Sequence, residues 1–439
     1  MVKVGPGGEA PDAIARIARP IHGEPDLDRL LEQIGAARIV LIGEPSHGMH
    51  ELHDLRGTLT RKLIAERGFA AVAVAGGWPE ALRIDRYVRG QSDDESAAAA
   101  LSGFERFPTW MWRNADVAAF AEWLAAWNSK RPAEQRAGFY GLDLYSLHVA
   151  IRSLLSLLDD ADPAAGRQAR EQFASFEHVG DGLTAALAAA PLELAAGLGD
   201  EIVAELVEMQ RRHVARSGRT PAGEGWFHAM QTSQVTRDAG AYYRALLGGR
   251  VVWTLRDGRM ADTIDVLAEQ LGTAGSPARL VVWAHNRHVG DARATAMGEA
   301  GEISLGQMMR QRHPGEVALI GMTTHAGTVV CARGWGEPAV VAPVPPSHNA
   351  SWEQLLHDSG FPRFYVAHAP LRRAFGERAE RLQRSIGVVY RPEAEGHQHY
   401  HRAHLADEFD VVVHIDACHA AAPLDGPAAA FDPSSTAGD

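Results

Sequence analysis

An acid, a hydroxyl and an imidazole lie close together in the stretch Gly43-Glu44-Pro45-Ser46-His47-Gly48. A carboxylate beside an imidazole can orient the ring, and the ring can then act as a general base. Ser46 offers a covalent alternative, but Glu44 stands where the nucleophile elbow Gly-x-Ser-x-Gly has its first glycine. We therefore expect His47 to be the base and Glu44 to be its partner.

The residues on either side predict that this stretch joins a strand to a helix. Four consecutive apolar residues, Ile39 to Ile42, are typical of a strand buried on both faces. Leucines at helical spacing follow between Glu51 and Glu66. Ligands of open α/β sheets bind at the carboxyl ends of the strands, so this turn is the expected place for an active site.

Other predicted strands also end in side chains that can take part in catalysis. His285 and His288 follow an apolar strand over Leu280 to Ala284, and Asp143 and Asp416 end two more. The gathering of such groups at the carboxyl ends favours one shared cleft. We expect the two histidines to donate a proton or to assist an oxyanion; as structural residues they would cap the next helix.

Two arginines belong to the same set of candidates. Arg56 lies in the first predicted helix, and Arg256 follows a strand predicted over Val251 to Leu255. A guanidinium offers a fixed fork of donors to an oxyanion or a substrate carboxylate. The structural alternative is an ion pair with a nearby acid such as Asp257.

His47, His50 and His53 form a His-x-x-His-x-x-His run, which is an alternative metal-binding pattern because imidazole is a common zinc ligand. The turn at Gly48 divides the run, and no carboxylate-rich set of residues surrounds it. We expect no metal and no other cofactor.

Several blocks in this order resemble the erythromycin esterase family. Each block alone is a weak signal, whereas their order over nearly the whole chain is specific. The blocks are the Gly43–Gly48 stretch with Arg56, Phe107-Pro108-Thr109-Trp110-Met111-Trp112-Arg113-Asn114, Gly138-Phe139-Tyr140-Gly141-Leu142-Asp143, Leu255-Arg256-Asp257 and Trp283-Ala284-His285-Asn286-Arg287-His288.

The resemblance implies an α/β fold with a central, largely parallel sheet flanked by helices and a helical insertion. It also implies metal-independent hydrolysis in which the histidine matching His47 activates water. It does not fix the substrate.

The chain departs from the family pattern at several positions. Members usually carry a Glu and an Asp after the second strand, where this chain has Ala75 and Gly77, and a Glu and an Asn where it has Met230 and Thr232. We expect these four residues, with Trp110, to line a drier, more apolar substrate pocket. Further departures are Thr254, Gly258, Arg259 and Ala417.

Three functions follow from these residues. The first is hydrolysis of an ester or lactone of a hydrophobic natural product, possible substrates being macrolide- or polyketide-like. The second is a repurposed acid/base enzyme that catalyses cyclisation, elimination or epoxide opening in specialised metabolism. The third is a non-catalytic ligand-binding protein, which the joint retention of Glu44 and His47 disfavours.

Bulk composition excludes several other classes. The formal net charge of −12 over 439 residues disfavours nucleic-acid and acidic-membrane binding. Two cysteines, Cys331 and Cys418, exclude a disulfide framework. No signal peptide and no run of about 20 apolar residues is visible. We expect a soluble cytoplasmic protein.

Changes in residue pattern along the chain predict four segments. Residues 1–145 and 248–424 alternate strand and helix signals and form the two parts of an α/β core. Residues 146–247 are alanine-rich with helical periodicity and predict a helical insertion over the strand ends. Residues 425–439 are rich in Pro, Ala, Ser and Gly and predict a disordered tail.

Overall fold

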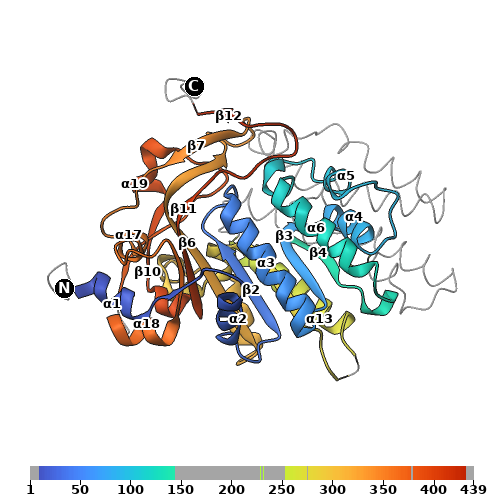
Figure 1. The fold of residues 1–439 in the computed structure, drawn as a ribbon, viewed down its shortest axis with the longest axis horizontal. Coiled ribbons are helices and arrows are strands. Elements are labelled where there is room, and N and C mark those ends of the chain that lie inside the picture. Colours follow the sequence, from blue (N-terminus) through green and yellow to red (C-terminus); the bar gives the residue numbers. More distant parts are fainter. Residues whose placement is uncertain are drawn as a thin grey trace, which may run out of the picture.

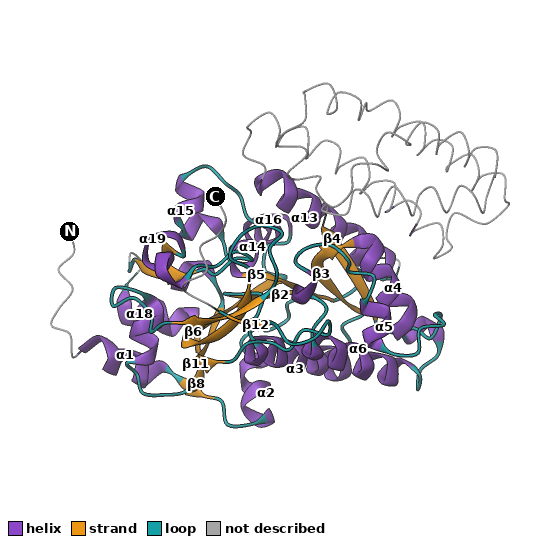
Figure 2. Cartoon of the chain, turned by 90° about the horizontal axis from the view of Figure 1, so that it is seen from above, coloured by secondary structure: helices purple, strands orange, loops and turns teal. Residues whose placement is uncertain are grey.

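The computed structural model describes residues 9–143, 228, 231, 253–273, 275–376 and 379–431. They form a ten-stranded sheet between two layers of helices (Figure 2). Neighbouring strands in its centre are parallel, which confirms the predicted α/β fold class. In spatial order the parallel strands are β4 (Gly138–Asp143), β3 (Ala71–Gly77), β5 (Leu280–His285), β2 (Ile39–Glu44), β6 (Val317–Cys331) and β11 (Val411–Cys418).

Antiparallel strands extend the sheet beyond β11 and along the end of β6, and Figure 1 shows the extension along β6. β8 (Arg363–Ala367) pairs with β11, and β1 (Arg19–Pro20) pairs with β8. β7 (Val340–Val344) pairs with β6, and β12 (Ala429–Ala430) pairs with β7. A separate two-stranded sheet contains β9 (Arg381–Arg384) and β10 (Tyr400–Ala403).

The apolar run of β2 is continuous because both faces of the strand are covered. Ile39 and Leu41 pack into one hydrophobic cluster with α13 (Trp253–Gln270) and α16 (Leu305–Arg312). Val40 and Ile42 pack into the other with α3 (His50–Arg67) and α6 (Ala115–Asn128). Figure 2 shows these helix pairs on opposite sides of the sheet. The strand and helix predicted around Glu44 and His47 are thus confirmed.

Shorter helices complete the described part of the chain. The α-helices are α1 (Glu9–Ile17), α2 (Glu24–Glu32), α4 (Trp78–Val88), α5 (Ala97–Leu101), α14 (Asn286–Val289), α15 (Ala296–Glu299), α17 (Trp352–His357), α18 (His368–Phe375), α19 (Glu395–Gln398) and α20 (Leu405–Glu408). The 3-10 helices are η1 (Thr109–Met111), η2 (Ala133–Gln135), η3 (Ala292–Ala294) and η4 (Pro392–Ala394). Within the described residues, no helix has both the length and the hydropathy to cross a bilayer.

The strand predicted over Val251 to Leu255 is wrong in its described part. Residues 253–255, expected to end a strand over Val251 to Leu255, instead begin α13. A short apolar run does not distinguish a strand from a buried helix. Here the run continues into Met260, Ile264 and Leu267, whose helical spacing places them in the core.

Two predicted segments are only partly described. Of the expected helical insertion over 146–247, the structure describes His228 and Gln231, both in helical conformation, and the rest lies outside the described residues. Of the expected disordered tail over 425–439, residues 425–431 are described. Ala429 and Ala430 form β12 there, because the edge of β7 offers unpaired backbone groups.

Candidate active site

The ends of β2 and β5 bring the first candidate residues together. The strands are parallel neighbours, and Glu44 pairs in register with His285. Gly43 allows α14 to pack closely on β2, because a Cβ atom at this position would lie 2.3 Å from Asn286 Oδ1. The turn that carries His47 and the helix that carries His288 therefore flank the same strand ends.

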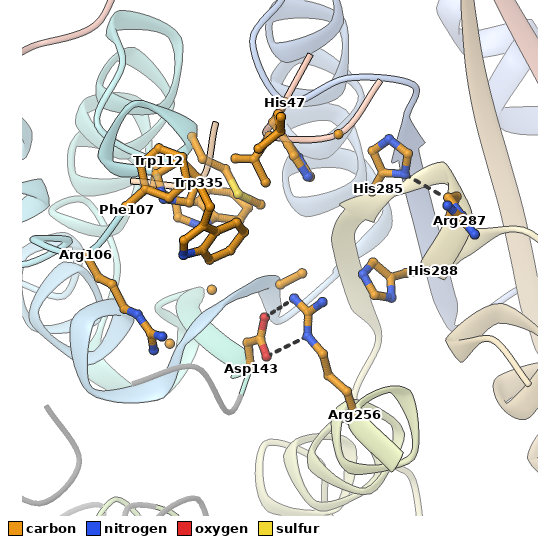
Figure 3. Close-up of a pocket in the computed structure, with 18 of the residues that line it drawn as sticks. His47, Arg106, Phe107, Trp112, Asp143, Arg256, His285, Arg287, His288 and Trp335 are labelled. Atoms are coloured by element: carbon orange, nitrogen blue, oxygen red, sulfur yellow. Dashed lines mark hydrogen bonds and ion pairs between the residues drawn. The ribbon is translucent and has the colours of Figure 1, made fainter. Parts of the chain in front are cut away.

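A cavity of about 410 Å³ lies at this edge of the sheet. Figure 3 shows His47, His285 and His288 on one side of it and aromatic rings on the other. Its lining includes six of the predicted site residues: His47, Ala75, Gly77, Arg256, His285 and His288. The lining also includes Gly76, Glu80, Phe104, Arg106, Phe107, Pro108, Met111, Trp112, Asp143, Trp253, Arg287, Trp335, Ser385, Gly387, Val388, Val389, Gln398 and His399.

Glu44 links His47 to Arg56 behind the wall of the cavity. Its Oε1 atom lies 2.9 Å from His47 Nδ1, and its Oε2 atom lies 2.7 Å from Arg56. Both Glu44 and Arg56 are buried, whereas the His47 side chain keeps 12% of its surface exposed. Arg56 also stacks over the Trp283 ring at 4.6 Å, so the carboxylate has a rigid cationic partner.

The charge of Glu44 determines which nitrogen of His47 carries the proton. Burial alone would raise the Glu44 pKa, but opposing effects, of which the charge of Arg56 is the largest, outweigh it and hold the pKa well below its usual range. An ionised carboxylate only accepts hydrogen bonds, so His47 Nδ1 donates to it. His47 Nε2 is then left with a lone pair, as a general base requires.

His53 positions this pair. We assign the proton to Nε2, which donates to the His47 carbonyl oxygen at 2.8 Å, while Nδ1 accepts from Arg56 at 2.7 Å. Burial lowers the His53 pKa to about 4, so the ring is neutral at physiological pH. His53 therefore fixes both the backbone of His47 and the guanidinium that compensates Glu44.

A second histidine–carboxylate pair, His288 and Asp257, contributes to the same cavity. Asp257 Oδ1 lies 2.7 Å from His288 Nδ1, and Asp257 Oδ2 accepts the Leu305 backbone N–H at 2.8 Å. The His288 ring stacks on Trp253, with ring centroids 4.4 Å apart and planes 8° apart. Both members of the pair are buried.

We assign a neutral state to both members of this second pair. Burial raises the Asp257 pKa well above its ordinary value. Burial, and after it the charge of Arg256, lowers the His288 pKa well below its ordinary value. The proton shared by the pair is therefore assigned to Asp257, which donates to His288 Nδ1. His288 Nε2 then carries the other proton and is a hydrogen-bond donor.

His285 lies beside His47, with ring centroids 5.1 Å apart, but both of its ring nitrogens are already bonded. Nε2 lies 3.2 Å from the Ile386 carbonyl oxygen, and Nδ1 accepts the Arg287 backbone N–H at 3.2 Å. Burial lowers the His285 pKa well below its ordinary value. This geometry supports a positioning role for His285 more than the expected proton transfer.

The two candidate arginines have structural partners. Arg56 is buried against Glu44 and does not line the cavity. Arg256 lines the cavity, and its guanidinium binds both carboxylate oxygens of Asp143, with Nε 3.0 Å from Oδ1. It does not pair with Asp257, because consecutive residues on a helix point about 100° apart.

The remaining candidates lie elsewhere. Trp110 is buried and is not among the lining residues, whereas its neighbours Met111 and Trp112 are. Met230 and Thr232 lie outside the described residues. Ser46 is also outside the lining, and its hydroxyl oxygen lies 3.5 Å from the Gly48 backbone N–H.

The three histidines of the metal-like run have separate partners. His47 binds Glu44, His50 binds Asp116 at 2.7 Å, and His53 binds Arg56. Within the described ranges, no group of three or more His, Cys, Asp or Glu side chains is arranged to hold a metal ion.

Sequence reasoning missed Asp257 as a site residue and most of the aromatic wall. At the expected strand end Arg256-Asp257, only the arginine was predicted to be a site residue. Phe104 and Phe107 lie in one loop, and Trp335 lies in another loop far along the chain. Phe107 and Trp335 meet with ring centroids 5.1 Å apart. No local pattern signals such a contact.

The largely parallel sheet between helices defines the α/β class of fold, and comparison with known proteins identifies the family. The family model described as erythromycin esterase matches residues 64–418. The chain therefore belongs to the erythromycin esterase family, as its sequence blocks predict. The matched range contains Asp257, His285 and His288 and begins after Glu44 and His47.

Individual relatives are distant. Erythromycin esterase type II of Escherichia coli is 29% identical over 129 residues, a match that spans 29% of the length of each chain. A solved succinoglycan biosynthesis protein has a TM-score of 0.74 at 18% identity and covers 95% of this chain and 100% of its own.

Two further solved structures share the fold. A Bacillus cereus protein has a TM-score of 0.74 at 14% identity, covering 94% of this chain and 98% of its own. A mutant of the erythromycin esterase EreC in its open conformation has a TM-score of 0.59 at 16% identity, covering 90% and 94%. Identities this low establish the shared fold and nothing finer.

Proposed function

We propose that this protein is a cofactor-free hydrolase of the erythromycin esterase type that cleaves an ester or lactone with His47 as general base. The observation that carries the proposal is the Glu44–His47 pair at the wall of the cavity. Glu44 is held ionised by Arg56, which leaves His47 Nε2 with its lone pair. Membership of the family supports a hydrolytic reaction.

In this reaction His47 Nε2 takes a proton from a water molecule as the water oxygen bonds to the carbonyl carbon. The carbonyl π electrons move to oxygen, and His288 Nε2–H is the donor we assign to that oxyanion. The oxyanion then collapses, the bond to the leaving oxygen breaks, and imidazolium His47 returns the proton to the leaving alkoxide. Glu44 remains ionised and stabilises the imidazolium charge throughout.

The lining of the cavity supports a hydrophobic small molecule as the substrate. Phe107, Trp112 and Trp335 present aromatic surface opposite the histidines (Figure 3). Apolar walls with a few placed polar groups are typical of small-molecule sites. A macrolide- or polyketide-like ester fits this description, and the Escherichia coli relative is described as an erythromycin esterase.

The strand end Ala75-Gly76-Gly77 favours a second candidate, a non-hydrolytic acid/base reaction. These residues line the cavity without any polar side chain. An ordered water needs about two to four hydrogen-bond partners, so this wall offers little to hold one. With water excluded, His47 would remove a proton from the substrate and promote cyclisation, elimination or epoxide opening.

Reaction in heavy-oxygen water separates the two candidates. The purified protein is incubated with a panel of 4-nitrophenyl esters and macrolide lactones, and the products are weighed by mass spectrometry. We expect one solvent oxygen in the acid product and none with His47→Ala. Products without solvent oxygen would favour the second candidate, and equal turnover by His47→Ala would contradict both.

A further inference from the structure

Arg287 differs from Arg56 and Arg256, the two arginines that the sequence predicts to be site residues. It lies in α14 between His285 and His288 and lines the cavity. Arg56 is paired with Glu44, and Arg256 with Asp143. Over the described ranges, the Arg287 guanidinium has neither an ion-pair nor a hydrogen-bond partner; only its backbone N–H is used, by His285.

An aromatic ring holds the guanidinium at the cavity. The guanidinium carbon lies 5.3 Å from the centre of the Trp253 ring, which also lines the cavity. Arg287 keeps an exposed surface, although enough protein surrounds it for burial to lower its pKa. The Trp253 indole N–H is buried without an acceptor among the described residues. Two donors therefore lie together without acceptors.

Among the described residues, the charge of Arg287 is poorly compensated. The carboxyl group whose charge acts on it is Glu408, and burial raises the Glu408 pKa well above its ordinary value, so this group is not a fixed negative charge. Burial, and after it the charge of Arg287, lowers the pKa of His401 to about 4. The charge of Arg287 thus acts on its described neighbours, in a chain whose formal net charge is −12.

We propose that Arg287 binds a carboxylate of the substrate, with the apolar body of that substrate against the aromatic rings of Phe107, Trp112 and Trp335. A carboxylate matches the planar fork of a guanidinium, and one guanidinium balances one negative charge. The inference rests on the proposed function, since it names the class of molecule that this site takes: apolar acids rather than cationic amines.

Binding of three matched ligands tests this inference without any turnover. The probes are 2-naphthoate, 2-naphthamide and 2-naphthylmethylammonium, which share an apolar body and differ in charge. Isothermal titration calorimetry at low ionic strength measures their affinities for the full chain. We expect the acid to bind at least about tenfold more tightly than the amide, and the amine to bind most weakly.

Variants assign the preference to the side chain. Arg287→Gln should abolish the preference for the acid but keep binding of the amide, because its backbone bond to His285 is retained. Arg287→Lys should keep part of the preference, since it keeps the charge and loses the fork. Arg16→Gln, an exposed arginine outside the cavity lining, is the matched control for net charge.

Similar affinities of the wild type for acid and amide, or no measurable binding of the acid, would overturn the inference. An undiminished preference for the acid in Arg287→Gln would do the same. Because none of these outcomes involves His47 or water, each leaves the proposed hydrolysis to be decided by its own isotope experiment.

Discussion

Two histidine–carboxylate pairs lie at one cavity, and they differ in what surrounds the acid. Glu44 has the buried cation Arg56 at 2.7 Å, whereas Asp257 has the backbone N–H of Leu305 at 2.8 Å. The pKa of Glu44 is therefore lowered, despite its burial, and that of Asp257 is raised by its burial. Similar residue pairs thus reach opposite charge states.

The difference assigns opposite roles to two chemically identical side chains. Beside an ionised acid, His47 carries its proton on Nδ1 and presents a basic Nε2. Beside a protonated acid, His288 accepts at Nδ1 and presents an Nε2–H donor. A hydrolytic site needs one group to accept a proton from water and another to stabilise the oxyanion. Whether a cation binds the acid, more than the histidine itself, determines which ring is the base and which is the donor.

Removal of the basic imidazole should have the largest effect. We expect His47→Ala to fold normally and to lower kcat by about 10² to 10⁴, the usual contribution of a general base. The measurement is steady-state hydrolysis of a 4-nitrophenyl ester. His50→Ala is the matched control, since His50 begins the helix after this turn but is exposed and bound to Asp116. An equal loss of kcat in both variants would contradict a general-base role for His47.

Exchange of the first acid for its amide should be nearly as damaging. In Glu44→Gln, Arg56 can only donate, so it fixes the amide oxygen and turns the amide NH₂ towards His47. His47 Nδ1 must then accept, and the proton moves to Nε2, where it blocks the base. We expect kcat to fall by at least about 10² while melting temperature changes little. Near-native kcat would show that Glu44 does not set the proton position.

Removal of the counter-charge should make the first pair resemble the second. In Arg56→Met, burial is no longer outweighed, so the Glu44 pKa should rise, and activity should recover only as pH rises through that higher pKa. The unpaired buried carboxylate should cost about 3–5 kcal/mol of stability. The pH dependence of kcat/KM measures the shift, with Arg56→Lys as the charge-retaining control. An unshifted profile would contradict the assigned role of Arg56.

Exchange of the second acid for its amide should have the smallest effect. In Asp257→Asn the side-chain oxygen can still accept from Leu305, and the NH₂ group can donate to His288 Nδ1 as the protonated acid does. His288 therefore keeps its Nε2–H donor, and we expect kcat to fall by less than about tenfold. A loss as large as that of Glu44→Gln would mean that Asp257 is ionised in the active protein.

Sequence reasoning predicted the first pair but not the second, for physical reasons. Glu44 and His47 lie three residues apart on one turn, and the apolar run before them identifies a buried strand. Asp257 and His288 are 31 residues apart and meet only because α13 and α14 both pack against α16. The apolar run before Arg256 was ambiguous between strand and helix, so the direction of the Asp257 side chain could not be predicted. Among the described residues, no arginine or lysine binds Asp257 as Arg56 binds Glu44, and no local pattern reveals this difference.

The central claim is that His47 and His288 carry their protons on different ring nitrogens, and this can be measured directly. Long-range ¹H–¹⁵N correlation spectra of protein with ¹⁵N-labelled histidine distinguish the two neutral tautomers of each ring, and spectra of His47→Ala and His288→Ala assign the signals. The account predicts the Nδ1–H tautomer for His47 and the Nε2–H tautomer for His288 at neutral pH. The same tautomer in both rings, or a doubly protonated His288, would contradict it.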